Sequence, residues 1–245
     1  MRKVVIFGAT SAIAQAAARL WANDGDELLL IARNSNRLQV LKKDLEVRGA
    51  ARVECLVSDL GDLGAQRELF AKITACLPEY DLALIAYGQL SDQIECQNNF
   101  ELARSEIRVN FVSVVALLME LARHFEHLRG GTIAVITSVA GDRGRAVNYT
   151  YGAAKAGLSV YLEGLRARLY SSGVNVLTIK PGFVDTPMTA KIKKGPLVAQ
   201  PETVGLGIYR AVARRRDVVY LPWFWLGIME VLKLIPAFIF KRLKF

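Results

Sequence analysis

Two tyrosines and a lysine stand close together in residues 148–155, NYTYGAAK. Side chains four residues apart share one face of a helix, whereas side chains six apart point away from each other. A helix here therefore pairs Tyr151 with Lys155 and sets Tyr149 aside. An ammonium beside a phenol favours the ionised phenol and lowers its pKa toward the range useful for proton transfer. We interpret Tyr151 and Lys155 as a candidate acid/base pair, with a chance spacing as the alternative.

A tight turn near the N-terminus is the second feature that could bind a ligand. Gly8 ends an expected strand, and a helix is expected to begin within a few residues of it. Such a turn gathers backbone N–H groups at the positive end of the helix dipole, which suits a pyrophosphate. Ala12 and Ala14 stand where a dinucleotide-binding loop has glycines, so an ordinary turn is the alternative. The residues expected at the phosphates are Gly8, Thr10, Ser11 and Ile13.

The end of the second expected strand indicates which dinucleotide would fit. A site that prefers NAD usually has an acidic residue there for the ribose 2′-hydroxyl, but this chain continues with Arg33. Arg33, together with Arg37, could pair with the 2′-phosphate of NADP. We therefore expect NADP(H) to be preferred over NAD(H). The neighbouring turns are expected to bring Asn34, Asp59 and Leu60 to the same cofactor.

These residues need a scaffold, and the whole chain has the alternation of a parallel sheet. Short β-rich runs are predicted at 3–8, 27–32, 52–57, 81–87, 131–137, 174–180 and 217–220. Segments of helical period are predicted at 12–24, 35–48, 63–77, 99–128, 149–171 and 201–215, with one more after Trp223. The pattern predicts an α/β fold: one doubly wound, Rossmann-like parallel sheet of about seven strands with helices on both faces. We expect this domain over residues 1–220 and an apolar, basic tail over 221–245.

Composition and charge narrow the class of protein. A length of 245 residues with 52% hydrophobic content suits one large domain. The uninterrupted apolar run before Gly8 has only four residues, which is too short for the core of a signal peptide. Three cysteines without metal-ligand spacing suggest reduced thiols, so we expect a cytoplasmic protein without a metal site. The net charge of +9 comes without a zinc-finger, RRM or basic-zipper pattern, so we expect no nucleic-acid partner.

Taken in order, these marks resemble the short-chain dehydrogenase/reductase family over essentially the full length. The intervals of 28 residues from Asn110 to Ser138 and of 13 from Ser138 to Tyr151 are those that the family uses. Residues 85–88, Ile-Ala-Tyr-Gly, depart from the family's usual Asn-Asn-Ala-Gly, which puts the detailed geometry there in doubt. The marks that carry the resemblance are the Gly8 turn, Asp59, Gly88, Asn110, Ser138, Tyr151, Lys155, Pro181, Gly182, Val184 and Thr186.

The resemblance implies hydride transfer between a nicotinamide cofactor and a ketone. Tyr151 is then the proton donor, Lys155 binds the nicotinamide ribose, and Ser138 holds the substrate carbonyl. By itself, Asn110 is an amide in an apolar helix, which suggests a structural hydrogen bond. The resemblance to the family implies instead that Asn110 relays protons or positions a water molecule. The cofactor contacts implied beyond the first turns are those of Ala86, Gly88, Tyr151, Lys155, Pro181, Gly182, Val184 and Thr186.

The tail allows two interpretations. Residues 221–240 are apolar, but Glu230, Lys233 and two prolines interrupt them, so a membrane-spanning helix is not expected. The segment covers the protein's own core or a subunit interface, or it lies on a membrane as an amphipathic helix. Trp223, Trp225 and the basic end of the chain, Lys241, Arg242 and Lys244, favour peripheral contact at the inner face of a membrane.

The same tail resembles one branch of the family, the decaprenylphosphoryl 2-ketoribose reductases. That branch implies a 2-keto sugar on a polyprenyl phosphate as substrate, whose phosphate would meet the basic cluster at 191–194, and a partner oxidase. The alternatives are another small ketone or lipid substrate, or a membrane-surface binding or scaffold protein that keeps the fold without turnover. The family also implies a homodimer or homotetramer, formed through the helices that bear Asn110 and Tyr151.

Overall fold

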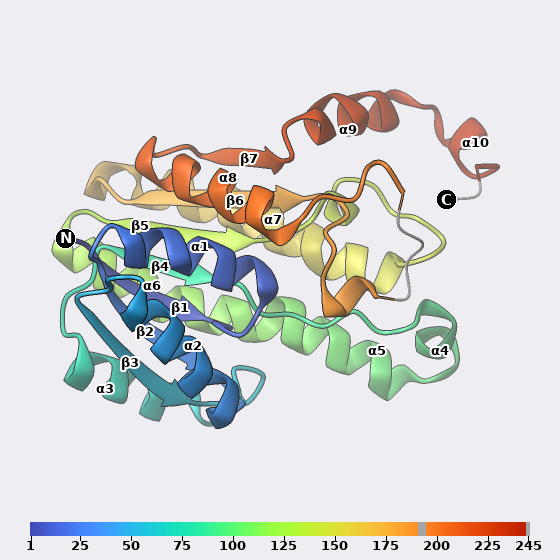
Figure 1. Ribbon diagram of the computed structural model, residues 1–245. Helices are drawn as coiled ribbons and strands as arrows, with labels where there is room; N and C mark the ends of the chain where they lie inside the picture. The colour runs from blue at the N-terminus through green and yellow to red at the C-terminus, as the bar shows by residue number, and fades with distance from the viewer. Residues whose placement is uncertain (191–194, 244–245) are drawn as a thin grey trace.

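The computed structural model describes residues 1–190 and 195–243. Its centre is a sheet of seven parallel strands in the order β3-β2-β1-β4-β5-β6-β7 (Figure 1). The strands are β1 Lys3–Phe7, β2 Glu27–Ala32, β3 Arg52–Val57, β4 Leu82–Ile85, β5 Thr132–Ile136, β6 Asn175–Pro181 and β7 Val218–Leu221. The predicted fold class is confirmed, with each strand within two or three residues of its expected place.

Helices cover both faces of this sheet. They are α1 Ala12–Asn23, α2 Ser35–Val47, α3 Gln66–Cys76, α4 Gln93–Asn98, α5 Phe100–Ile107, α6 Ser113–Leu128, α7 Tyr149–Leu169, α8 Pro201–Ala213, α9 Phe224–Leu234 and α10 Ala237–Phe240. Alternate strand residues face opposite sides, so Val4 packs with α1, α2 and α8, whereas Val5 packs with α3, α6 and α7. Apolar residues at successive strand positions therefore build two cores, as a sheet buried on both faces requires.

The segment expected as one helix over 99–128 is divided. Asn99 caps α5 by accepting a hydrogen bond from the Leu102 N–H at 3.2 Å, and Asp92 caps the unpredicted α4. Between α5 and α6, Arg108–Val112 form a π-helical turn that contains Asn110. Such turns often occur at functional sites. The apolar period gave no sign of this turn, because a π turn inserts one residue without ending the helix.

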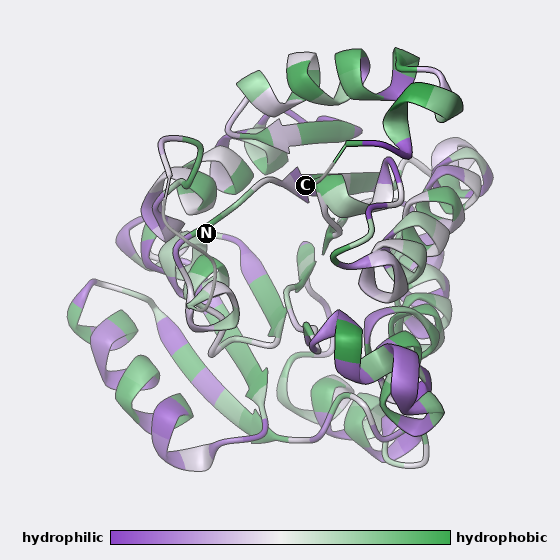
Figure 2. Cartoon of the chain, turned by 90° about the vertical axis from the view of Figure 1, so that its right-hand side faces the viewer, coloured by the Kyte–Doolittle hydropathy of each residue, from purple (hydrophilic) through white to green (hydrophobic). Residues whose placement is uncertain are grey.

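The segment after β7 continues beyond the carboxyl end of that strand and forms α9 and α10 (Figure 1). Hydrophobic residues predominate along α9 (Figure 2). Trp225 and Met229 are buried against the domain, so one face of α9 covers the protein's own core. In the ranges described, none of the helices is both long enough and apolar enough to span a bilayer.

Candidate active site

A cavity of about 470 Å³ lies at the carboxyl edge of the sheet. Strand order reverses beside β1, where β2 and β4 flank it, and ligands of doubly wound folds bind at this point. The volume falls in the range of small-molecule sites. Of the predicted site residues, those that line the cavity are Gly8, Thr10, Ser11, Ile13, Arg33, Asp59, Leu60, Ala86, Gly88, Ser138, Tyr151, Lys155, Pro181, Gly182, Val184 and Thr186.

The turn after β1 requires glycine at its first position. Gly8 has a φ of 83°, which side chains rarely adopt, and a Cβ there would lie 2.7 Å from the Tyr87 backbone nitrogen. Its own N–H donates to the Ile31 carbonyl at 2.8 Å, which fixes the turn against β2. Tyr87, in the departure from the family pattern, is held by a 2.9 Å hydrogen bond between its hydroxyl and Ser113 Oγ.

The start of α1 fits the pyrophosphate of a dinucleotide. Ser11 precedes the helix without a side-chain cap, so the first-turn N–H groups are available to a ligand at the cavity wall. Ala12 lines the cavity, whereas Ala14 is fully buried in the core and takes no space from it. The two alanines therefore leave the cavity open.

The polar residues that follow β2 have two different roles. Arg33 and Arg37 line the cavity, and Arg37 Nη2 donates to the Thr10 carbonyl at 3.3 Å, which joins the two turns. Asn34 is not among the residues that line the cavity, and its expected contact with the cofactor stays a prediction. Its Oδ1 accepts the Arg37 N–H at 2.9 Å and caps α2.

The predicted acid/base pair lies on the first turns of α7. Tyr151 and Lys155 both line the cavity, and Lys155 Nζ lies 5.7 Å from the centre of the Tyr151 ring. Lys155 is 3% exposed and donates to the Ile136 carbonyl at 3.1 Å. Tyr149 is 45% exposed and lies outside the cavity wall. The helix therefore separates the two tyrosines as the spacing predicted.

The direction of the Tyr151 pKa differs from the expectation. Burial raises the pKa of Tyr151 to about 12, a hydrogen bond with Ser138 opposes this rise, and the Glu106 carboxylate adds to it. Burial also lowers the pKa of Lys155 to about 8, while Glu106 raises it. The expected lowering of the phenol pKa by Lys155 is thus wrong for the free protein, because desolvation dominates both groups. Tyr151 keeps its proton at neutral pH.

Asn110 lies behind the cavity wall, fully buried. Its Nδ2 donates to the carbonyls of Gln89 at 2.9 Å and Glu106 at 3.0 Å, and its Oδ1 accepts the Gln89 N–H at 3.2 Å. The amide thus fixes the chain after β4 to the π-helical turn. A relay role through Asn110 stays a prediction.

Glu106, a buried carboxylate one turn before Asn110, was missed by the sequence analysis. It is 1% exposed and accepts the Ser91 N–H at 2.9 Å. Burial raises its pKa, whereas Ser91 and the more distant Lys155 lower it. The four-residue spacing from Asn110 could have placed it on the same helix face.

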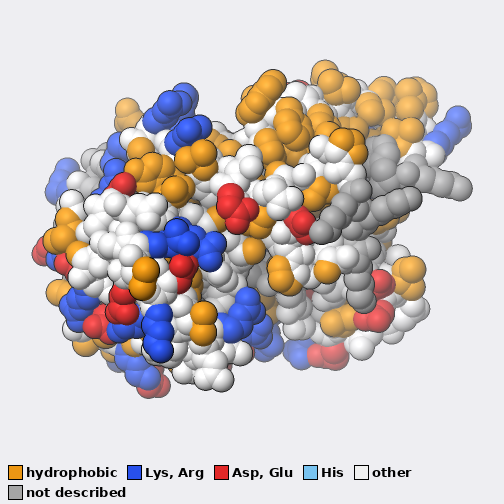
Figure 3. Space-filling view, viewed as in Figure 1, with side chains coloured by type: hydrophobic (Ala, Val, Ile, Leu, Met, Phe, Trp, Pro, Cys, Tyr) orange, Lys and Arg blue, Asp and Glu red, His pale blue; other side chains and the backbone are white. Residues whose placement is uncertain are grey.

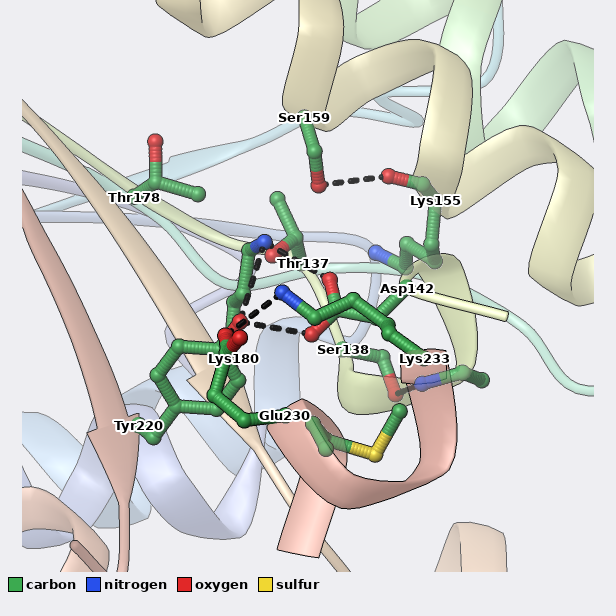
Figure 4. A network of polar contacts seen from close by, with 12 residues as sticks. Thr137, Ser138, Asp142, Lys155, Ser159, Thr178, Lys180, Tyr220, Glu230 and Lys233 are labelled. Carbon is green, nitrogen blue, oxygen red and sulfur yellow. Dashed lines mark hydrogen bonds and ion pairs between the residues drawn. The ribbon is translucent and has the colours of Figure 1, made fainter. Parts of the chain in front are cut away.

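A polar network fixes the loop that follows Ser138. Ser138 Oγ accepts the Ala140 N–H at 3.1 Å, and Asp142 then lies between Lys180 and Tyr220 (Figure 4). Asp142 Oδ1 lies 2.7 Å from Lys180 Nζ, and its Oδ2 accepts from the Tyr220 hydroxyl at 2.6 Å. This largely buried ion pair ties the loop to β6 and β7.

Helix α9 supports the loop after β6 from outside. A Cβ on Gly182 would lie 1.9 Å from Trp225 Nε1, so glycine is required for the close approach of α9. The cofactor contact expected at Gly182 stays a prediction, and the contact with Trp225 is a second reason for glycine there. Arg143 donates to the carbonyls of Leu232 and Lys233, which joins α9 to the loop after Ser138 as well. Helix α9 of the tail therefore contacts two loops that line the cavity, the one after β6 and the one after Ser138.

Two further expectations concern metals and cations. In residues 1–190 and 195–243, no three His, Cys, Asp or Glu side chains gather as they would around a metal ion. The basic cluster at 191–194 and Lys244 lie outside the described residues.

Comparison with known proteins identifies the family of this chain. Residues 2–196 match the family model described as short chain dehydrogenase. An uncharacterized oxidoreductase of Mycobacterium tuberculosis is 35% identical over 240 residues, covering 98% of this chain and 96% of the relative. An uncharacterized oxidoreductase of Streptomyces coelicolor is 29% identical over 243 residues, covering 99% and 96%.

A solved structure shares the fold. The short-chain dehydrogenase from Sphingobium yanoikuyae in complex with NADPH superposes with a TM-score of 0.81, at 24% identity and 97% coverage of both chains. The family model covers most of this chain and the first relative is matched over nearly its whole length. This protein therefore belongs to the short-chain dehydrogenase family and is an oxidoreductase of that type.

Proposed function

We propose that the protein is an NADPH-dependent reductase of a ketone, with Tyr151 as the proton donor. The observation that carries this proposal is the convergence of Ser138, Tyr151 and Lys155 on one cavity whose other end begins at an uncapped helix N-terminus. A bound nicotinamide cofactor would supply the hydride.

The residues of this chain supply the proton and the polar contacts. Tyr151, with its pKa near 12, holds a proton that it can give to the carbonyl oxygen. Ser138 Oγ accepts the Ala140 N–H and is hydrogen-bonded with Tyr151, so its hydroxyl lies beside the proton donor, where it would donate to the same carbonyl oxygen when a ketone binds. Lys155, held by the Ile136 carbonyl, is placed to bind ribose hydroxyls of the cofactor and to return the proton to Tyr151.

Two arginines support the preference for NADPH. Arg33 and Arg37 line the cavity beside the α1 turn, and the turn after β2 has no carboxylate that would hold a ribose 2′-hydroxyl. Guanidinium groups bind phosphate through paired hydrogen bonds. A 2′-phosphate would therefore gain contacts here that NAD lacks.

For the substrate we propose a 2-keto sugar carried on a polyprenyl phosphate, met at the membrane surface. Hydrophobic side chains gather over α9 and α10 (Figure 3). Trp223 and Leu234 are each 81% exposed, and the basic residues Lys241 and Arg242 follow α10 in the chain. An apolar surface with aromatic and basic flanks suits an anionic bilayer, where a lipid-linked substrate would reside.

Two matched variants test the catalytic assignment. NADPH and NADH are titrated into purified protein by nicotinamide fluorescence, and turnover is then measured on lipid-linked 2-keto sugars. Tyr151→Phe is expected to lower turnover about 10²- to 10⁴-fold because the proton donor is lost, with NADPH binding nearly unchanged. Tyr149→Phe, outside the cavity wall, is expected to be mild. Equal losses in both variants would show that the wrong tyrosine was chosen.

A further inference from the structure

Arg145 is a buried cation that the proposed reaction does not use. It lies between Ser138 and Tyr151 in the chain, lines the same cavity, and is 9% exposed. Its Nη2 donates only to a weak acceptor, Met229 Sδ, at 3.4 Å. Its Nε is buried and has no hydrogen-bond partner in the structure as described.

The carboxylate that acts on the Arg145 pKa is engaged by other residues. The Asp142 carboxylate raises the Arg145 pKa, but burial lowers that pKa by more. Both Asp142 oxygens are already bonded, one to Lys180 and one to Tyr220. An arginine stays charged, and a buried charge without a partner is strongly unfavourable. Among the described residues, no carboxylate therefore forms an ion pair with the Arg145 guanidinium.

A second unpartnered atom lies beside it on the same wall. Asn148 also lines the cavity, its amide does not cap α7, and its Oδ1 is buried without a hydrogen-bond partner among the described residues. Asn148 is three residues from Tyr151, at the end of the cavity that holds Ser138 and Tyr151. Because both side chains line the cavity, a ligand that presents an anion and a neighbouring hydroxyl would contact Arg145 and Asn148 together.

We propose that Arg145 is an anion-binding subsite of the substrate, which takes a phosphate or carboxylate group of the ketone while Asn148 binds an adjoining hydroxyl. This inference rests on the proposed function, because that function makes the ligand of the cavity a substrate. The subsite would select hydroxylated anionic ketones over neutral ones, because a neutral ketone leaves the buried guanidinium unpaired.

The first test measures binding and does not depend on turnover. Inorganic phosphate and acetate are titrated by calorimetry into the full-length protein saturated with NADPH, as wild type, Arg145→Met and Arg143→Met. Arg143→Met removes the same charge from the same loop, but Arg143 contacts α9 and does not line the cavity. We expect Arg145→Met to bind the anion at least about ten-fold more weakly, and Arg143→Met to stay within about two-fold of wild type.

The outcomes separate the possibilities. Tighter binding of phosphate than of acetate assigns a phosphorylated ligand, and the reverse assigns a carboxylate. Equal affinities of wild type and Arg145→Met overturn the subsite. Removal of an unpaired buried charge should not lower the melting temperature, so a lowered value with unchanged anion binding also overturns it and gives Arg145 a structural role.

The second test measures selectivity. Dihydroxyacetone phosphate and hydroxypyruvate are compared with neutral dihydroxyacetone, and Arg145→Met should lose the preference for the anionic ketones without losing the neutral one. Absence of turnover on every ketone, with Arg145-dependent anion binding intact, refutes the ketone reduction and leaves the subsite standing.

Discussion

The buried amine of Lys155 makes the stability of this protein depend on pH in a predictable direction. Burial lowers the Lys155 pKa from 10.5 to about 8. Below about pH 8 both the folded and the unfolded chain bind the proton, and the folded state bears the unfavourable buried charge. Between about pH 8 and the unfolded pKa, only the unfolded state keeps the proton, so the free energy of unfolding contributed by Lys155 rises with pH.

The size of this effect follows from the pKa difference. The interval between 10.5 and about 8 corresponds to about 3 kcal/mol as an upper limit, at about 1.4 kcal/mol for each pH unit. Lys155→Met removes the titrating group. The free energy of unfolding of wild type relative to Lys155→Met should therefore increase by up to about 3 kcal/mol from about pH 7 to about pH 10.

Urea unfolding of the cofactor-free protein at the two pH values measures this difference. The comparison with Lys155→Met cancels other groups that titrate in the same window. Lys72→Met is the matched control, because Lys72 is more than half exposed and pairs only with Glu68 on the surface of α3. Its pH dependence should match wild type within about 0.5 kcal/mol. If Lys155→Met also tracks wild type across the window, the argument from desolvation is refuted.

Two further changes test the packing around the site. Burial raises the Glu106 pKa above 4.5, so the folded state keeps this proton to higher pH and the contribution of Glu106 to stability falls as pH rises through that window. The urea midpoint of wild type relative to that of Glu106→Gln should therefore be lower at about pH 8 than at about pH 4.5. A midpoint change between the two pH values that is the same in both proteins would contradict this. Gly182→Ala should cost about 1–3 kcal/mol, because the new Cβ would overlap Trp225, and should change tryptophan fluorescence. Gly227→Ala, where a Cβ meets nothing within 4 Å, is the control and should not destabilise; similar losses in both would remove the steric explanation.

Local pattern alone predicted most of the scaffold, whereas the resemblance to the family supplied most of the candidate site residues. The β-rich runs and helical segments alternate, and each is decided within a few residues by the period of its apolar positions. The four-residue interval from Tyr151 to Lys155 fixes their common face once the segment is helical. Loops at the carboxyl ends of parallel strands must meet at one edge, so Gly8 and Ser138 were expected at one cavity before the packing was known.

Tertiary packing decided the electrostatics. The pKa of Tyr151 rises because desolvation depends on every element that covers the phenol, and sequence spacing carries no measure of it. Asn34 caps α2, because its side-chain oxygen accepts the nearby Arg37 N–H. Trp225, more than forty residues later in the chain, leaves no room for a side chain at Gly182, and only the packing of α9 reveals this constraint. Arg145 lies in the loop between Ser138 and Tyr151, and the sequence gives no sign that this side chain is buried and contacts Met229 of α9.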